Sequence, residues 1–416
     1  MRLFATTAMT LALTASAALA ETEITFQLWG SPEEGEVWTR VADAFHAEHP
    51  DITVKVEVAD WDSYWEKLRV LVSGGTPPDV FAMDAPLYPD WQSRGALLNL
   101  QPYLDADPSA LEGVFPVTLE AYKTPEGYFG LPRDFQTIVL YYNKAMFDAA
   151  GVAYPTADWT WDDLRATAKQ LTLDKDGDGT TDQWGFWAEV YDQEPFWGSV
   201  VWSFGGDIID VAAGKTLIDS PEAAAAFEFI RAMWLDDKSM PTTSQLAQYG
   251  YDGFLSGIAA MGVSGHWSVP EYAAAGINFD VAPLPQGPAG RATGVNSAGF
   301  VISSATKNPD AAWAFVKFAT GEVGQSELAK LGFAVPIRES VAASDAYLKQ
   351  ATPINQQLFV DALAYARPKP VFRGYEDWAG AVGDALTTIW EEEAEIADAL
   401  AEAVAGGDEA LAKAAE

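Results

Sequence analysis

The stretch FQLWGSPEEGEVWTRVADAFHAEHPDITVKVEV, residues 26–58, predicts a strand, a Trp-Gly break, a helix and a second strand. Apolar and polar side chains alternate over 22–28 and 52–58, which is typical of half-buried strands. A second helix over 61–72 and a short buried strand over 80–83 follow. This β-α-β-α-β order predicts an α/β sheet with largely parallel strands and right-handed crossovers.

The helix between the first two strands is predicted from its apolar spacing. Its apolar side chains recur at intervals that place them on one face of a helix. They are Val37, Trp38, Val41, Ala44 and Phe45.

The first twenty residues have the pattern of a cleavable export signal. Arg2 supplies a positive charge, residues 3–17 are apolar, and Ala18-Leu19-Ala20 fits the cleavage pattern. A membrane anchor is the less favoured alternative, because the stretch is short and rich in Ala and Thr. We therefore expect a mature chain that begins at Glu21 in the periplasm. The sequence has no cysteine, so we expect neither a lipoprotein anchor nor disulfides.

Size and charge narrow the class of protein. The chain has 416 residues, enough for two domains with substantial cores, and a formal net charge of −35. Such a charge repels nucleic acid and anionic membranes, which makes both poor partners. The chain also has 16 Trp and 15 Tyr, and rings on loops beside glycine often serve as binding platforms.

Three further patterns lie in the rest of the chain. Residues 136–142 predict one strand that leads into a helix over 144–150. Thr160 followed by Asp163 predicts a capped helix start. The Ala/Glu-rich stretch 391–416 predicts a helix that is interrupted at Gly406-Gly407.

Several segments resemble, in their order and spacing, the extracellular solute-binding proteins of ABC sugar importers, the family 1 group that includes the maltose-binding protein. They are ITFQLWG, YWEKLRVLVSGGTPPDVFAMD, GLPRDFQTIVLYYNKAMFDAAGV, GVNSAGFVISSATKNPDAAWAFVKFAT and VFRGYEDW. The resemblance implies an α/β, two-lobe periplasmic binding protein fold of type II, in which each lobe is a mixed sheet flanked by helices. It places the N-terminal lobe at 21–133 and 281–335 and the C-terminal lobe at 134–280 and 336–416.

The same resemblance implies a function. The chain would be the monomeric substrate-binding component of an ABC transporter for carbohydrate uptake, closing at a hinge on its ligand and delivering it to the permease subunits. No cofactor is required for this. A binder of a cationic ligand such as a polyamine is the first alternative. An exported glycoside hydrolase, which needs two carboxylates across the sugar, is the second. We do not expect it, because the order of strands and helices lacks the eight-fold βα period of the usual barrel hydrolase.

Sugar recognition indicates which side chains to look for. Pyranose faces pack on aromatic rings, and hydroxyls need planar groups that donate and accept hydrogen bonds. Ligands of open α/β sheets sit outside the carboxyl ends of the strands. The candidates at strand ends and glycine loops are Trp29, Glu33, Glu34, Asp84, Asp134, Gln136, Trp197, Trp202, Asp207, Trp267, Asn296, Arg373 and Trp378.

Two acidic candidate positions have structural alternatives. Glu33 and Glu34 either accept hydroxyls at the mouth of the cleft or form an acid pair favoured by a helix N-terminus. Asp134 either lies in the cleft, pairs with Arg133 or caps a turn.

The tryptophans and the arginine also leave alternatives open. Trp197 and Trp202 flank one short segment, and we expect one to face the cleft and the other the core. Arg373 either holds an anionic substituent of a sugar or, slightly favoured, pairs with Glu376 or Asp377. Trp267 and Trp378 match stacking positions of the family that the chain resembles.

The segment DKDGDGTTDQWG, residues 174–185, resembles part of a calcium loop. Asp174, Asp176, Asp178 and Asp182 occupy positions 1, 3, 5 and 9, but glycine replaces the bidentate glutamate of position 12. The sequence therefore leaves two alternatives, a solvated Asp/Gly turn, which we favour, and a structural Ca²⁺ site.

Overall fold

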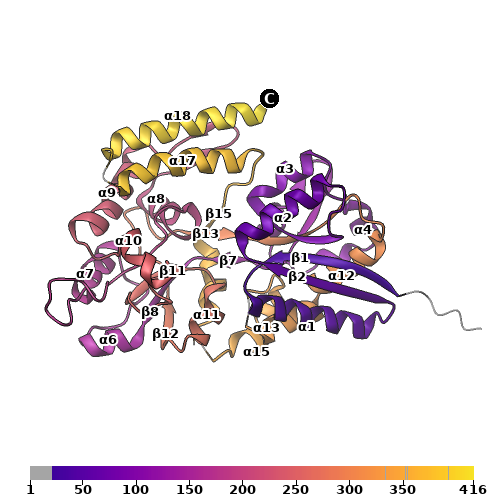
Figure 1. Ribbon diagram of the computed structural model, residues 1–416, viewed down its shortest axis with the longest axis horizontal. Coiled ribbons are helices and arrows are strands. Elements are labelled where there is room, and N and C mark those ends of the chain that lie inside the picture. Colours follow the sequence, from indigo (N-terminus) through magenta and orange to yellow (C-terminus); the bar gives the residue numbers. More distant parts are fainter. Residues whose placement is uncertain (1–20, 333, 352, 354, 392) are drawn as a thin grey trace, which may run out of the picture.

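The computed structural model describes residues 21–416 except 333, 352, 354 and 392. The export signal predicted over residues 1–20 lies outside the described residues. The chain forms two lobes, and the first, in indigo and purple, lies on the right of Figure 1. In the described part of the chain, no helix is long and apolar enough to cross a membrane.

The first lobe is built on a five-stranded sheet in the order β2-β1-β3-β14-β6. These strands are β1 (Thr22–Trp29), β2 (Ile52–Ala59), β3 (Val80–Asp84), β6 (Gly130–Pro132) and β14 (Ala298–Ile302). Strands β1, β2 and β3 are parallel as predicted, whereas β14 is antiparallel to β3 and β6, so the sheet is mixed. Parallel strands end at one edge, which therefore carries Trp29 and Asp84 toward the second lobe.

Helix α1 (Pro32–Glu48) shows how the sequence builds this lobe. Its N-cap is Ser31, whose hydroxyl accepts the Glu34 N–H at 3.3 Å. Trp38, Val41 and Phe45 of the predicted apolar face are buried, and Val37 and Ala44 are half-buried. The Trp38 ring meets the Phe26 ring of β1 edge-on at 5.9 Å. The other helices of this lobe include α2 (Trp61–Ser73), η1 (Ala85–Leu87), α3 (Tyr88–Ser93), α4 (Gln101–Ala106), α5 (Pro116–Glu120), α12 (Pro309–Thr320) and α13 (Glu322–Lys330).

The second lobe contains an antiparallel sheet in the order β11-β8-β12. Its strands are β8 (Val139–Asn143), β11 (Met261–Ser264) and β12 (Phe279–Ala282), with a small hairpin of β9 (Ile209–Asp210) and β10 (Lys215–Thr216). Its helices include α6 (Lys144–Ala150), α7 (Trp161–Leu171), η3 (Gln193–Trp197), α8 (Gly198–Phe204), α9 (Pro221–Arg231), η4 (Ala232–Asp236), α10 (Thr243–Leu246) and α11 (Ser268–Ala274). The capping box predicted at Thr160 and Asp163 is present at the start of α7.

A three-stranded sheet, β15-β13-β7, lies between the lobes in Figure 1. It consists of β7 (Gln136–Thr137), β13 (Thr293–Asn296) and β15 (Ala366–Pro368). The single strand predicted over 136–142 is therefore wrong. The chain changes sheets at Ile138, whose N–H donates to the Thr293 hydroxyl at 3.1 Å and whose carbonyl accepts from it at 2.7 Å.

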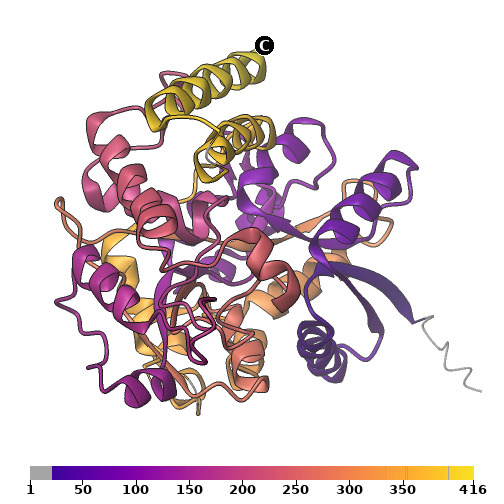
Figure 2. The ribbon, with the colours of Figure 1, turned by 60° about the vertical axis from the view of Figure 1, so that its left-hand side comes forward.

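The C-terminal part adds α14 (Glu339–Ala342), α15 (Asp345–Leu348), α16 (Gln357–Asp361), α17 (Tyr375–Trp390) and α18 (Ile396–Ala415). Helices α17 and α18 pack side by side above the second lobe in Figures 1 and 2. The predicted interruption at Gly406-Gly407 is wrong, because α18 continues through both residues. A Cβ at Gly407 would lie 2.4 Å from the Thr216 hydroxyl oxygen and 3.0 Å from Trp378 Nε1. The glycine therefore permits close packing here and does not break the helix.

Candidate functional site

Two adjoining cavities lie between the lobes. We call the larger, of about 650 Å³, the aromatic cavity, and the other, of about 370 Å³, the polar cavity. Residues of both lobes and of the segment after β15 line them together, so they form one continuous cleft. The shared residues are Trp61, Asp84, Glu189, Asp192 and Lys369.

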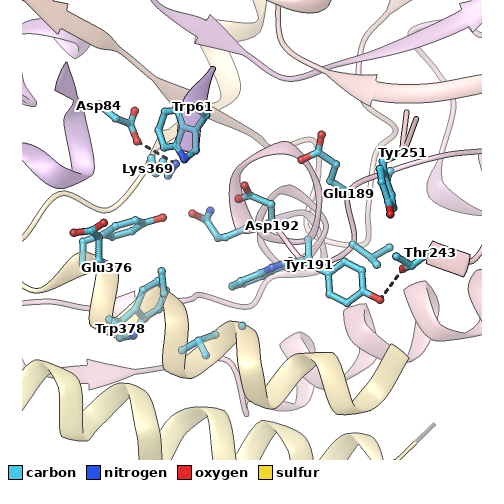
Figure 3. Close-up of a pocket in the computed structure, with 18 of the residues that line it drawn as sticks. Trp61, Asp84, Glu189, Tyr191, Asp192, Thr243, Tyr251, Lys369, Glu376 and Trp378 are labelled. Atoms are coloured by element: carbon cyan, nitrogen blue, oxygen red, sulfur yellow. Dashed lines mark hydrogen bonds and ion pairs between the residues drawn. The ribbon is translucent and has the colours of Figure 1, made fainter. Parts of the chain in front are cut away.

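The aromatic cavity is walled by rings from both lobes (Figure 3). Trp61, the first residue of α2, contributes from the first lobe and is 45% exposed. The other rings are Trp187, Tyr191, Trp197, Trp234, Tyr251, Tyr375 and Trp378. Flat apolar surfaces of this kind suit the C–H faces of sugar rings.

The polar cavity combines two tryptophans with charged groups. Trp29, at the end of β1, is held by ring contacts, including a stacked contact with Trp65 at 5.7 Å between centroids. Trp267, at the start of α11, contributes from the second lobe and is half-buried. The polar and charged lining residues outside the shared set are Glu34, Arg133, Asp134, Gln136, Glu194 and Asn296.

A hydrogen-bonded network joins the lobes to the small sheet at the floor of the cleft. Lys369 Nζ lies 2.7 Å from Glu194 Oε2 and 3.6 Å from Asp84 Oδ2. Asn296 Nδ2 donates to Asp84 Oδ1 at 2.7 Å and to Glu194 Oε2 at 3.1 Å. Burial alone would lower the pKa of Lys369, but the neighbouring carboxylates hold that pKa well above its ordinary value. The lysine is therefore charged, and it compensates one acid from each lobe.

Other carboxyl groups of the cleft differ in their surroundings. Arg133 and Asp134 form a buried ion pair, with 2.8 Å between Nε and Oδ2, and burial raises the pKa of Asp134 despite this partner. Desolvation in the cleft raises the pKa of Glu34 to about 7, and it raises the pKa of Glu189 to about 7 as well.

The structure brings most of the predicted site residues into this cleft. Those that line one or both cavities are Trp29, Glu34, Asp84, Asp134, Gln136, Trp197, Trp267, Asn296 and Trp378. Asp134 both lines the cleft and pairs with Arg133, so the cleft and ion-pair alternatives hold together. Gln136 Oε1 accepts the backbone N–H of His266 at 3.1 Å and thus links β7 to the segment that carries Trp267.

Among the described residues, four predicted site residues do not line either cavity. They are Glu33, Trp202, Asp207 and Arg373. Glu33 is exposed in the first turn of α1, where the favourable interaction with the helix N-terminus accounts for it. Trp202 is buried, and its Nε1 donates to Asp207 Oδ1 at 3.3 Å, so Trp197 is the tryptophan that faces the cleft.

Arg373 forms neither of the ion pairs predicted for it. Its guanidinium donates to the Ala414 carbonyl at the end of α18. Glu376 pairs instead with Arg69 of α2, at 2.5 Å. The reason is the packing of α18 on α17, which brings a helix C-terminus to the arginine.

Sequence reasoning missed several lining residues. Trp61 follows the carboxyl end of β2, so the strand-end rule that indicated Asp84 could have found it. Glu189, Asp192 and Glu194 lie in or beside the π-helical turn η3, which has no clear sequence pattern. Lys369 lies between two prolines after β15, and only the tertiary structure brings it to the cleft.

The Asp-rich loop is exposed and lies apart from the cleft. Carboxylate oxygens of Asp174, Asp176 and Asp182 lie within 4.8 Å of one another, and Asp178 is not in this group. The two oxygens of Asp174 accept the backbone N–H groups of Gly177 and Gly179. The calcium alternative stays a prediction.

Comparisons with known proteins agree with this geometry. The model of the bacterial extracellular solute-binding protein family matches residues 29–326. A binding protein of Brucella abortus is 26% identical, over 97% of this chain and 96% of its own. The maltotriose-binding protein of Pyrococcus abyssi is 28% identical, over 70% of this chain and 60% of its own.

A solved structure is similar over nearly the whole chain. The ABC substrate-binding protein of Listeria monocytogenes in complex with cycloalternan superimposes with a TM-score of 0.85. It is 26% identical, and the match covers 94% of this chain and 98% of that one. This similarity confirms the predicted two-lobe fold. The residue limits predicted for the lobes stay a prediction.

Proposed function

The chain belongs to the family of bacterial extracellular solute-binding proteins, and from this premise we propose that it binds a carbohydrate for an ABC importer. One observation carries the proposal. The cleft between the lobes is walled by aromatic rings and lined by carboxylate and amide groups drawn from both lobes. Rings for sugar faces and planar polar groups for hydroxyls are what carbohydrate recognition needs. The names of the Pyrococcus relative and the Listeria complex, maltotriose and cycloalternan, point to oligosaccharides.

The mechanism follows from which lobe supplies each contact. Trp29, Glu34 and Trp61 belong to the first lobe, and Trp267 and Trp378 approach from the other side of the cleft. A ligand that contacts both walls gains affinity only when the lobes close, so it favours the closed form. A ligand that contacts only one wall has equal affinity for the open and closed forms, so it does not shift the equilibrium between them. Closure around the sugar would present it to the permease subunits from the periplasm.

A thermal-shift screen of the mature protein tests this function. The panel contains neutral mono- and disaccharides, maltotriose, amino sugars and the polyamine spermidine. A ligand that binds only the folded state adds about 2.7 kcal/mol at about a hundred times its Kd, so stabilisation by at least one sugar is the expected result. Stabilisation by spermidine alone, or by no compound, would contradict carbohydrate binding.

A further inference from the structure

Gly265 lies directly behind the ring of Trp267, the tryptophan that the second lobe contributes to the polar cavity. A Cβ atom at position 265 would lie 2.0 Å from Trp267 Cζ3 and 2.3 Å from Cε3, two atoms of the six-membered ring. Gly265 is buried and is not among the described residues that line the cavity, whereas Trp267 is half-buried and lines it. The ring therefore lies between the backbone of Gly265 and the cavity, at a distance that only glycine permits.

The backbone at Gly265 is held by side chains from other segments. The Tyr141 hydroxyl of β8 donates to the Gly265 carbonyl at 2.6 Å. The next residue, His266, donates its backbone N–H to Gln136 Oε1 at 3.1 Å, and its ring Nε2 lies 2.8 Å from Gln356 Oε1. Tyr141, His266 and Gln356 are all buried. A methyl group added at position 265 would therefore displace the tryptophan ring more easily than it would displace the chain.

The ring of Trp267 is fixed by packing. Among the described residues, no aromatic ring contacts Trp267 and no hydrogen bond holds its indole N–H. It packs on the apolar core and against Gly265. Trp29 on the opposite wall differs, because the rings of Trp61 and Trp65 hold it at 5.0 and 5.7 Å between centroids. The contact with Gly265 thus limits how far the Trp267 ring can lie back from the cavity.

We propose that Gly265 is a positioning residue for sugar binding, because it lets the Trp267 ring lie back against the chain and leaves the space in front of the ring to a sugar. To restore an ordinary van der Waals contact of 3.4 Å with a side chain at position 265, Trp267 Cζ3 would have to move by about 1.4 Å. The backbone lies behind the ring, so the open direction is the cavity. Binding side chains have to be held to within about 0.5 Å, so this shift weakens stacking. The inference rests on the proposed carbohydrate function and adds to it a residue that acts from outside the cleft.

Alanine at position 265 should move the ring without unfolding the lobe. Gly265 is not among the described glycines with a positive φ, so its backbone conformation is open to alanine. The three atoms nearest to the added methyl group belong to the end of the Trp267 side chain and not to the backbone. We therefore expect Gly265→Ala to fold and to differ from the wild type mainly in its affinity for sugar.

A double-mutant cycle of Gly265→Ala and Trp267→Ala separates positioning from a general structural role. Calorimetry measures the binding of maltotriose, maltose and cellobiose, and of each other sugar that stabilises the mature protein in the thermal-shift screen. We expect Gly265→Ala to raise the Kd of the sugar that the wild type binds by about fivefold or more. In the Trp267→Ala background the same change should have no effect, because the ring is absent. Gly380→Ala, whose methyl group meets open space in α17, is the control and should leave the Kd unchanged.

The binding results that would contradict the proposal can be told apart. An unchanged Kd in Gly265→Ala would overturn the inference and leave the carbohydrate function intact. An equal loss in the wild-type and Trp267→Ala backgrounds would do the same, because it would show that Gly265 acts without the ring. Failure of the wild type to bind any of the sugars would overturn the carbohydrate function and the inference together.

Thermal melts of each variant provide a second readout that does not depend on a sugar. A Gly265→Ala variant that fails to fold should be rescued in the double variant with Trp267→Ala, because the atoms that clash with the methyl group are then removed. A double variant that also fails to fold would overturn the inference, because it would show that the backbone and not the ring requires glycine at position 265.

Discussion

Replacing Glu34 by glutamine should stabilise the ligand-free protein at neutral and alkaline pH. The pKa of Glu34 rises from 4.5 to about 7 on folding, because the cleft desolvates its carboxylate. That rise corresponds to at most about 3 kcal/mol of unfolding free energy. Loss of a negative charge in the first turn of α1 offsets about 0.3–1 kcal/mol of this gain. The expected net gain is about 2–3 kcal/mol.

The sign of the pH dependence follows from proton binding. The folded protein holds a proton on Glu34 between about pH 4.5 and pH 7, whereas the unfolded chain has released it. The stability of the wild type therefore falls as the pH rises through this window. Glutamine does not titrate, so the advantage of Glu34→Gln should be full above about pH 7 and absent below about pH 4.5.

Urea denaturation followed by tryptophan fluorescence measures this advantage at about pH 4 and about pH 8. Glu33→Gln is the control, because Glu33 shares the first turn of α1 but is exposed. It loses the same interaction with the helix N-terminus without relieving any desolvation. A Glu34→Gln variant that is less stable than wild type at pH 8, or equally advantaged at both pH values, would refute the reasoning.

Three other perturbations test separate parts of the structure. Lys369→Met should lower the unfolding free energy by about 3–5 kcal/mol, because it leaves Glu194 and Asp84 buried without their cation; an unchanged urea midpoint would contradict the network. Gly407→Ala should destabilise the protein, because the added methyl group clashes with Thr216. Gly380→Ala in α17, where the added methyl group meets open space, should stabilise it by about 0.5–1 kcal/mol. A change in Tm of the same sign for both variants would contradict the packing at Gly407. For the loop at Asp174, a rise in Tm with Ca²⁺ that Asp174→Asn removes would confirm the calcium alternative. A Tm that changes with neither Ca²⁺ nor EDTA would support the solvated turn that we favour.

The first lobe was the most predictable part of the molecule, because its structure is local. Alternation and helical spacing located β1, α1, β2, α2 and β3 to within two residues. The errors came where distant contacts decide. The strand predicted over 136–142 is split by the Thr293 hydroxyl, more than a hundred residues away. Gly407, predicted to interrupt a helix, instead permits close packing on Thr216 and Trp378.

Site residues at the ends of strands could be predicted from the sequence, whereas site residues that tertiary packing brings to the cleft could not. Trp29 and Asp84 come directly from the carboxyl ends of β1 and β3. Lys369 and Gln193 have no comparable signal, because a lysine between prolines and a glutamine in a π-helical turn are ordinary in sequence. Only the fold shows that Lys369 holds two carboxylates and that the side-chain amide of Gln193 is buried without a hydrogen-bond partner among the described residues.

The most direct test of carbohydrate binding in this cleft is a calorimetric titration of the best sugar from the screen into wild type and Trp267→Ala. Tyr249→Ala, which removes an exposed ring that lines neither cavity, is the control. We predict one site per chain, a loss of about 1–3 kcal/mol in Trp267→Ala, equivalent to about 5- to 150-fold in Kd, and no change in the control. An unchanged Kd in Trp267→Ala would contradict the assignment of the cleft as the sugar site.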